Sequence, residues 1–283
     1  MKSIRLKNGM DLPCLGMGTW TLGEHGDRQE REISALRAGL EAGIRLIDTA
    51  EMYGVGKAEV LVGKAIRGFD RDSLFLVSKV YPWNAGKKNL LRSLEGSLAR
   101  MGTDYLDLYL LHWPGSIPLE ETIACMEEAM DRGLIRAWGV SNMDKSQMEA
   151  LYSLPGGSAC QVDQVCYHLG SRGVEYDLHP FLRQTGTAMM AYCPLAQGGS
   201  LRKGLTGSEA VLRTAERLGL TPLQVLLAFV LAREGTCAIP GSGRAAHVLA
   251  NLEAAGKALS PSDLTLLDRA FPPPAGPVPL DKV

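Results

Sequence analysis

D48-T-A-E-M-Y-G54, S78-K-V80 and L111-H-W113 are three segments in which an aliphatic run gives way to polar side chains. Their spacing matches successive strand ends in a chain that alternates strands and helices. In a parallel barrel, the carboxyl ends of the strands open at one mouth. The spacing therefore predicts a barrel that gathers four residues far apart in sequence: Asp48, Tyr53, Lys79 and His112.

The rest of the chain repeats this alternation, with turn residues between the elements. We expect strands at 14–18, 44–48, 74–80, 105–111, 135–140, 161–165, 187–192 and 236–240. The expected helices lie at 29–42, 57–67, 87–101, 119–132, 144–153, 175–183, 209–231 and 244–255, and Thr221-Pro222 divides the seventh into two. Eight such repeats, with strands buried on both faces, predict an α/β fold of the (β/α)8 TIM barrel type.

Two pieces fall outside the repeat. Residues 3–7 turn at Asn8-Gly9 into an N-terminal β-hairpin that we expect to plug the lower end of the barrel. An extra C-terminal helix should begin at Ser260-Pro261, and the proline-rich tail 271–283 should be extended. Because such a barrel takes about 250 residues, we expect a single domain over residues 1–283.

Composition points to a small-molecule partner. The net charge of -1 gives no basic footprint for nucleic acid and no surface that attracts membranes. The N-terminus lacks a secretory signal, and the longest apolar run is far shorter than the roughly 20 residues of a membrane span, so we expect a cytoplasmic protein. Six scattered cysteines form no C-x-x-C pair, which favours reduced thiols, and no H-x-H or comparable pair predicts a metal.

The four gathered residues suit reduction of a carbonyl. A free phenol has a pKa of about 10, and a neighbouring ammonium such as Lys79 should lower it toward the working range of a general acid. Asp48 would keep Lys79 charged, and His112 could donate to the substrate oxygen as charge develops there. Singly, each residue also has an ordinary explanation, as a turn former, a packed ring, a solvated cation or a core histidine.

The chain resembles the aldo-keto reductase family. The matching segments are L12-P-C-L-G-M-G-T-W20, D48-T-A-E-M-Y-G54, S78-K-V80, L111-H-W113, G139-V-S-N142, Q164-V-C-Y-H168, A191-Y-C-P-L195 and I239-P-G-S242. The resemblance implies a (β/α)8 barrel, NADPH across its mouth and Tyr53 as the acid. It is strongest to a bacterial branch that includes methylglyoxal reductases and ends in F-P-P-P, and it favours a monomer over an obligate oligomer.

The same resemblance implies the cofactor contacts. Ser141, Asn142 and Gln164 would bond the nicotinamide carboxamide, and Tyr192 would stack on its ring; without the resemblance, they would pass as a helix cap and a core aromatic. The loop 195–204 is expected to close over the pyrophosphate. Its Arg202 and Lys203 suit that role, although a pair of surface cations is usually only a solvated turn. The remaining predicted cofactor contacts are Gly18, Thr19, Trp20, Asp48, Pro194, Leu195, Ile239, Ser242, Gly243, Arg244, His247 and Asn251.

The adenosine end departs from the family pattern. Gly241 and His247 stand where that pattern has a lysine and an arginine, and Ala250 replaces an acid. Ser242, Gly243 and Arg244 still open a helix, whose amides and guanidinium suit a phosphate. A histidine adds charge only below pH of roughly 6.5. We therefore expect NADPH as the cofactor and leave use of NADH open.

Trp20 and Trp113, with Tyr81 and Trp83 as further candidates, predict a shallow aromatic substrate pocket. Small aldehydes and 2-oxoaldehydes such as methylglyoxal fit it. Two other functions stay open. The chain could be an NADPH-binding redox sensor or regulatory subunit with little turnover. It could also be a lyase in which Lys79 forms a Schiff base, which requires a neutral lysine.

Overall fold

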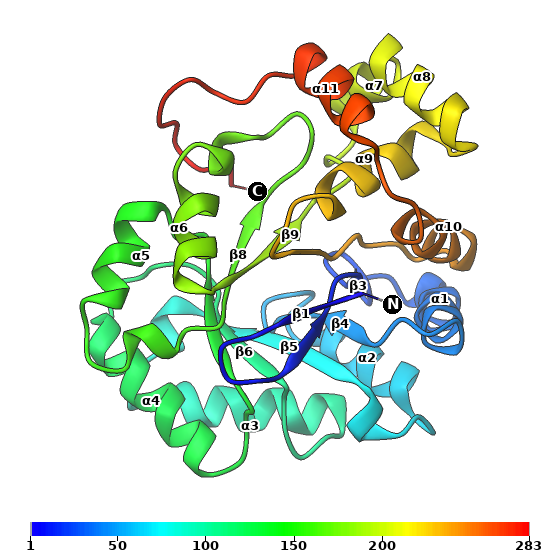
Figure 1. Cartoon of the computed structure of the whole chain (residues 1–283). Helices are drawn as coiled ribbons and strands as arrows, with labels where there is room; N and C mark the ends of the chain where they lie inside the picture. The colour runs from blue at the N-terminus through cyan, green and yellow to red at the C-terminus, as the bar shows by residue number, and fades with distance from the viewer. Residues whose placement is uncertain (1, 283) are drawn as a thin grey trace.

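The computed structural model describes residues 2–282 and contains an eight-stranded parallel sheet. Figure 1 shows the helices arranged around these strands. The strands are β3 (Gly16–Gly18), β4 (Leu46–Asp48), β5 (Phe75–Val80), β6 (Leu108–Leu111), β7 (Trp138–Ser141), β8 (Val162–Cys166), β9 (Ala188–Tyr192) and β10 (Thr236–Ala238). Neighbours in sequence pair in parallel throughout.

The first and last strands close the sheet into a barrel. Leu15 and Gly18 form parallel bridges with Ala238 and Gly241, and the Ala238 amide donates to the Cys14 carbonyl at 2.9 Å. Six of the eight strands lie within the predicted ranges, and β7 and β8 each extend one residue past them, so the barrel prediction is confirmed.

The helices match the predicted order, with one addition. They are α1 (Gln29–Glu41), α2 (Lys57–Ile66), α3 (Leu90–Met101), α4 (Leu119–Asp131), α5 (Lys145–Tyr152), α6 (Leu178–Thr185), α7 (Gly199–Thr206), α8 (Glu209–Leu218), α9 (Pro222–Leu231), α10 (Ala245–Ala255) and α11 (Pro261–Ala270). The predicted break at Thr221-Pro222 is confirmed. The expectation of a loop over 195–204 is wrong in its second half, because α7 begins at Gly199. Glycines in this segment disfavour a helix, but burial of Leu205 stabilises it.

Two apolar layers result from the alternation of side chains along the strands. Inward-facing residues such as Leu46, Val77 and Leu110 fill the barrel. Outward-facing residues such as Ile47 and Leu111 pack with the residues of the surrounding helices. With its interior filled by side chains, the barrel leaves the loops at the strand ends to form a site.

The N-terminal hairpin pairs β1 (Ser3–Arg5) with β2 (Asp11–Pro13). Its Leu6 and Leu12 are buried in the same cluster as the inward-facing barrel residues, so the prediction of a plug is confirmed. At the other end of the chain, the tail after α11 is extended and runs back to the loop after β8, where Ser171 Oγ donates to Asp281 Oδ2 at 2.5 Å.

Candidate active site

Three of the four predicted catalytic residues meet at one ammonium group. Lys79 Nζ lies 2.6 Å from Asp48 Oδ1 and 3.1 Å from the Tyr53 hydroxyl, and it also donates to the Thr49 carbonyl at 2.9 Å. Asp48 ends β4, Lys79 lies near the end of β5, and Tyr53 sits on the loop after β4. Asp48 and Lys79 are 31 positions apart in sequence, and their neighbouring strands bring a carboxylate, an ammonium and a phenol into contact.

The surroundings of Lys79 determine whether it acts as a charged ammonium or as a neutral amine that forms a Schiff base. Its side chain is 0% exposed and its Nζ donates to three oxygens. Burial alone would lower the pKa of Lys79, but the carboxylate of Asp48 and the phenol of Tyr53 outweigh burial and raise it. A charged ammonium has no lone pair with which to attack a carbonyl, so the geometry disfavours a Schiff-base lyase.

The predicted pKa of Tyr53 is wrong in direction. Burial raises the pKa of this phenol, and the lowering by Lys79 does not outweigh burial together with the Asp48 carboxylate. The sequence could not reveal this because burial depends on the fold. Tyr53 therefore keeps its proton at neutral pH, and the ammonium 3.1 Å away can stabilise the phenolate that forms once the proton leaves.

His112 completes the group from the strand end next to Lys79. Its ring packs edge-on against Tyr53, with centroids 5.7 Å apart. Burial, with a smaller effect of Lys79, lowers the pKa of His112 to about 3. Its buried Nδ1 has no hydrogen-bond partner within residues 2–282. The imidazole is thus neutral at pH 7 and offers a single N–H donor.

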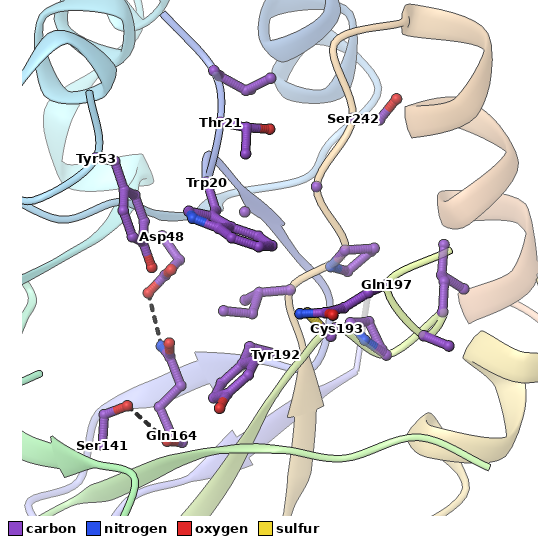
Figure 2. A pocket seen from close by; sticks show the side chains of 18 of the residues that line it. Trp20, Thr21, Asp48, Tyr53, Ser141, Gln164, Tyr192, Cys193, Gln197 and Ser242 are labelled. Atoms are coloured by element: carbon purple, nitrogen blue, oxygen red, sulfur yellow. Dashed lines mark hydrogen bonds between the residues drawn. The ribbon is translucent and has the colours of Figure 1, made fainter. Parts of the chain in front are cut away.

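A cavity of about 520 Å³ opens at this end of the barrel. Asp48, Tyr53 and His112 form part of its wall, and the wider lining contains most of the remaining predicted site residues. These are Gly18, Trp20, Trp113, Ser141, Asn142, Gln164, Tyr192, Pro194, Leu195, Ile239, Ser242 and Gly243. Figure 2 shows side chains from several strand ends converging on this space.

Polar side chains along one wall form a connected network. Gln164 Nε2 donates to Asp48 Oδ2 at 2.8 Å, and Ser141 Oγ donates to the Gln164 carbonyl at 2.8 Å, as the dashed lines in Figure 2 show. Asn142 Nδ2 donates to Ser141 Oγ, and the Tyr192 hydroxyl donates to Asn142 Oδ1 at 2.8 Å. The predicted amide-reading residues and the predicted stacking ring are therefore held in place next to the Asp48 carboxylate.

The rest of the predicted cofactor residues lie outside this lining. Thr19 is buried, and its hydroxyl donates to the Asp48 carbonyl. Arg244 precedes α10, and exposed His247 and nearly buried Asn251 lie on it. His247 Nδ1 is 3.3 Å from Ser242 Oγ, so this histidine touches the end of the cavity through Ser242.

The cavity wall also contains residues outside the firm sequence predictions. Arg202, which the sequence offered only as a candidate because surface cations in a turn are usually solvated, lines the cavity from α7. It donates through Nε to the Leu195 carbonyl at 2.9 Å and so anchors the loop before α7. The lining residues that sequence reasoning did not place in the site are Thr21, Leu22, Met52, Cys193, Ala196, Gln197, Pro240 and Gly241.

Within residues 2–282, no three His, Cys, Asp or Glu side chains are placed to hold a metal ion. In the same part of the chain, no single helix is long and apolar enough to cross a membrane. By length and composition alone, one sharply bent pair, α8 with α9, would meet that test.

A barrel mouth that combines a protonated phenol, a charged ammonium and a neutral imidazole fits the class of oxidoreductases that reduce carbonyl groups. The model of the aldo/keto reductase family matches residues 14–271, and the chain belongs to this family.

Relatives agree over the full length. The chain is 50% identical to methylglyoxal reductase YeaE of Escherichia coli over 282 residues, covering 100% of this chain and 99% of that one. It is 32% identical to a glyoxal reductase of Bacillus subtilis, covering 94% and 91%. An aldo/keto reductase from Klebsiella pneumoniae, solved with NADP and acetate, superposes with a TM-score of 0.96 at 49% identity, covering 100% and 99%.

Proposed function

We propose that this protein reduces small aldehydes and 2-oxoaldehydes such as methylglyoxal to alcohols, with NADPH as the hydride source and Tyr53 as the proton donor. The observation that carries the proposal is the ammonium of Lys79, which bonds both Asp48 and the Tyr53 hydroxyl at the wall of the cavity. The family relatives that act on methylglyoxal and glyoxal support the substrate class.

The cavity wall fits a nicotinamide cofactor. Ser141, Asn142 and Gln164 present hydroxyl and amide groups suited to a carboxamide, and Tyr192 offers an aromatic face. At the far end, Ser242 and Gly243 precede α10, whose amino end favours an anionic phosphate. NADPH supplies a hydride when bound, and related structures were solved with NADP or NADPH.

The proton follows a short path. Tyr53 donates its phenolic proton to the carbonyl oxygen of the substrate, and Lys79 stabilises the resulting phenolate. Asp48 holds Lys79 in the charged form. Neutral His112 donates its N–H to the same substrate oxygen, so negative charge developing there is stabilised before the proton arrives.

A nicotinamide oxidation assay tests this function. The wild-type protein should consume NADPH in the presence of methylglyoxal, with NADH run in parallel because Gly241 and His247 replace two expected cations. Tyr53→Phe removes the proton donor, and we expect kcat to fall by about 100-fold or more while the Kd for NADPH stays unchanged. Tyr176→Phe, at an exposed tyrosine, is the matched control.

Wild-type turnover by Tyr53→Phe would show that Tyr53 is not the acid. Tight binding of NADPH without turnover of any aldehyde would instead support a sensor or regulatory subunit. We further propose that the protein is a cytoplasmic monomer, which light scattering of the purified protein tests for the oligomeric state.

A further inference from the structure

Glu51 lies between Asp48 and Tyr53 in sequence but takes no part in the proposed proton transfer from Tyr53. Its Oε1 accepts a hydrogen bond from the backbone amide of Tyr81 at 2.8 Å and another from Asn84 Nδ2 at 3.2 Å. Tyr81 directly precedes η3 (Pro82–Asn84), the turn that follows β5, and Asn84 is its last residue. One half-buried carboxylate thus joins the catalytic loop to the neighbouring loop of the mouth.

That neighbouring turn carries an aromatic wall. Tyr81 and Trp83 stack with centroids 4.3 Å apart and an interplanar angle of 21°. Both rings meet Trp113 edge-on, at 6.0 and 5.8 Å. Trp113 in turn packs against His112 at 4.7 Å, and these last two residues line the cavity. Tyr81 and Trp83 are not among the residues that line the cavity, so the turn acts on the cavity wall through Trp113.

The turn itself is held by buried Pro82 and Ala85 and by the bond from the Asn84 amide to the Tyr81 carbonyl at 2.9 Å, but the described side-chain bonds that tie it to the loop after β4 both go to Glu51. Trp83 is 58% exposed, so burial does not fix its ring. A hydrogen bond to a carboxylate is stronger than one to a neutral acceptor, and Glu51 accepts two from the turn. Loss of this carboxylate would leave the Tyr81 amide unpaired and allow the stacked pair to move.

We propose that Glu51 is a positioning residue that fixes the Tyr81 and Trp83 pair against Trp113, and thereby fixes the Trp113 side of the cavity wall and sets the affinity for compact carbonyl substrates. The inference rests on the proposed reductase function. Glu51 makes no bond to the Tyr53 hydroxyl or to Lys79 Nζ among the described hydrogen bonds, so its effect should fall on substrate binding and not on the chemical step. Such a residue changes KM and leaves kcat.

The test compares two substitutions at Glu51. We expect Glu51→Ala to raise the KM for methylglyoxal by about 3- to 30-fold, with kcat within about twofold of wild type and an unchanged Kd for NADPH. Glu51→Gln keeps an oxygen that can accept both bonds but loses the charge that strengthens them, so its KM should lie between those of wild type and Glu51→Ala. Glu41→Ala, at an exposed carboxylate at the end of α1, is the control.

Glu51→Ala should also lose selectivity for small substrates. A loosened wall loses contact with a small substrate but makes room for a larger one, so the preference of Glu51→Ala for methylglyoxal over benzaldehyde should fall. Asn84→Ala breaks one of the two bonds and leaves the carboxylate, and it should raise KM by a smaller factor. If both residues act through their bond, the double variant should be no worse than Glu51→Ala alone.

Three results would overturn the inference. Glu51→Ala could keep the wild-type KM, could lose kcat in place of affinity, or could be matched by an equally impaired Glu51→Gln, which would indicate a role for charge and not for positioning. Asn84→Ala tests the same bond if Glu51→Ala does not fold. A wild-type protein that reduces no aldehyde refutes the proposed function itself, whereas an active wild type with an unaffected Glu51→Ala refutes only the role of Glu51.

Discussion

Four residues that border the cavity hold a backbone conformation that is rare outside glycine. Thr21, Asn142, Cys193 and Ala196 have φ values of 68°, 60°, 52° and 55°. A positive φ costs a residue with a Cβ about 1–3 kcal/mol, and such strain persists where the surrounding structure enforces it. At Asn142 the enforcement is visible, because its side chain bonds Ser141, Tyr192 and the His112 carbonyl.

His112 should make stability depend on pH. Its folded-state pKa of about 3 lies below the unfolded value of about 6.5. Between these values the unfolded chain binds a proton that the folded chain does not, so stability falls as the pH falls, by at most about 1.4 kcal/mol per pH unit. We expect urea unfolding between pH 6 and 4 to show this slope, and His112→Gln to reduce it.

His25→Gln, at an exposed histidine, is the control and should leave the slope unchanged. Other buried groups titrate in the same range, so the informative quantity is the difference between wild type and variant at each pH. Equal slopes for wild type and His112→Gln would mean that the imidazole is protonated in the folded protein.

The sequence predicted which residues meet at the mouth but not their ionisation or all of their neighbours. Strand-end positions are set by periodicity, so Asp48, Lys79 and His112 could be located. The raised pKa of Tyr53 comes mainly from burial, which no local pattern encodes. Arg202 could be named only as a candidate, because whether it is solvated or lines the cavity depends on how α7 packs.

At the scale of elements, caps were the most readable signals. Thr221 precedes Pro222 at the start of α9, and its hydroxyl accepts a hydrogen bond from the backbone N–H of Gln224. In return, Gln224 Oε1 accepts one from the backbone N–H of Thr221. Such reciprocal bonds satisfy amides that the first helical turn leaves without partners. By contrast, α7 has no side-chain cap, and its G-S-L-R-K-G-L-T sequence has weak helix propensity.

Thr221→Ala should therefore destabilise the protein. Loss of an N-cap side chain costs about 0.5–2 kcal/mol, and α9 lies in the core, where Val225, Leu226 and Phe229 are fully buried. We expect urea denaturation to give a lower unfolding free energy for Thr221→Ala, whereas Thr221→Ser, which keeps the hydroxyl, should stay near wild type. A Thr221→Ser variant as unstable as Thr221→Ala would assign the effect to the lost methyl group instead.

At the scale of the whole molecule, the repeat of strand and helix made the fold predictable, and closure of the barrel assembled the candidate site. Each strand and helix repeat could be located by its local pattern, but no local pattern specifies how far the last strand is from the first. In the structure β3 meets β10, and this contact brings Gly18 beside Gly241, both on the cavity wall. Closing the barrel thus joins the two ends of the candidate cofactor site.

Gly18 is where closure should be most sensitive to a side chain. A Cβ at this position would lie 2.6 Å from the Ile239 carbonyl oxygen, a backbone atom that cannot rotate away. Overpacking of this kind costs about 1–3 kcal/mol, so Gly18→Ala should lower the unfolding free energy by that amount. At Gly241 the nearest backbone oxygen would be 3.1 Å from the Cβ, so Gly241→Ala should cost less. Gly26→Ala is the control, because a Cβ at Gly26 would have no neighbouring atom within 4 Å. If Gly18→Ala unfolds at the same urea concentration as Gly26→Ala, β3 and β10 can separate enough to accept a methyl group without loss of stability.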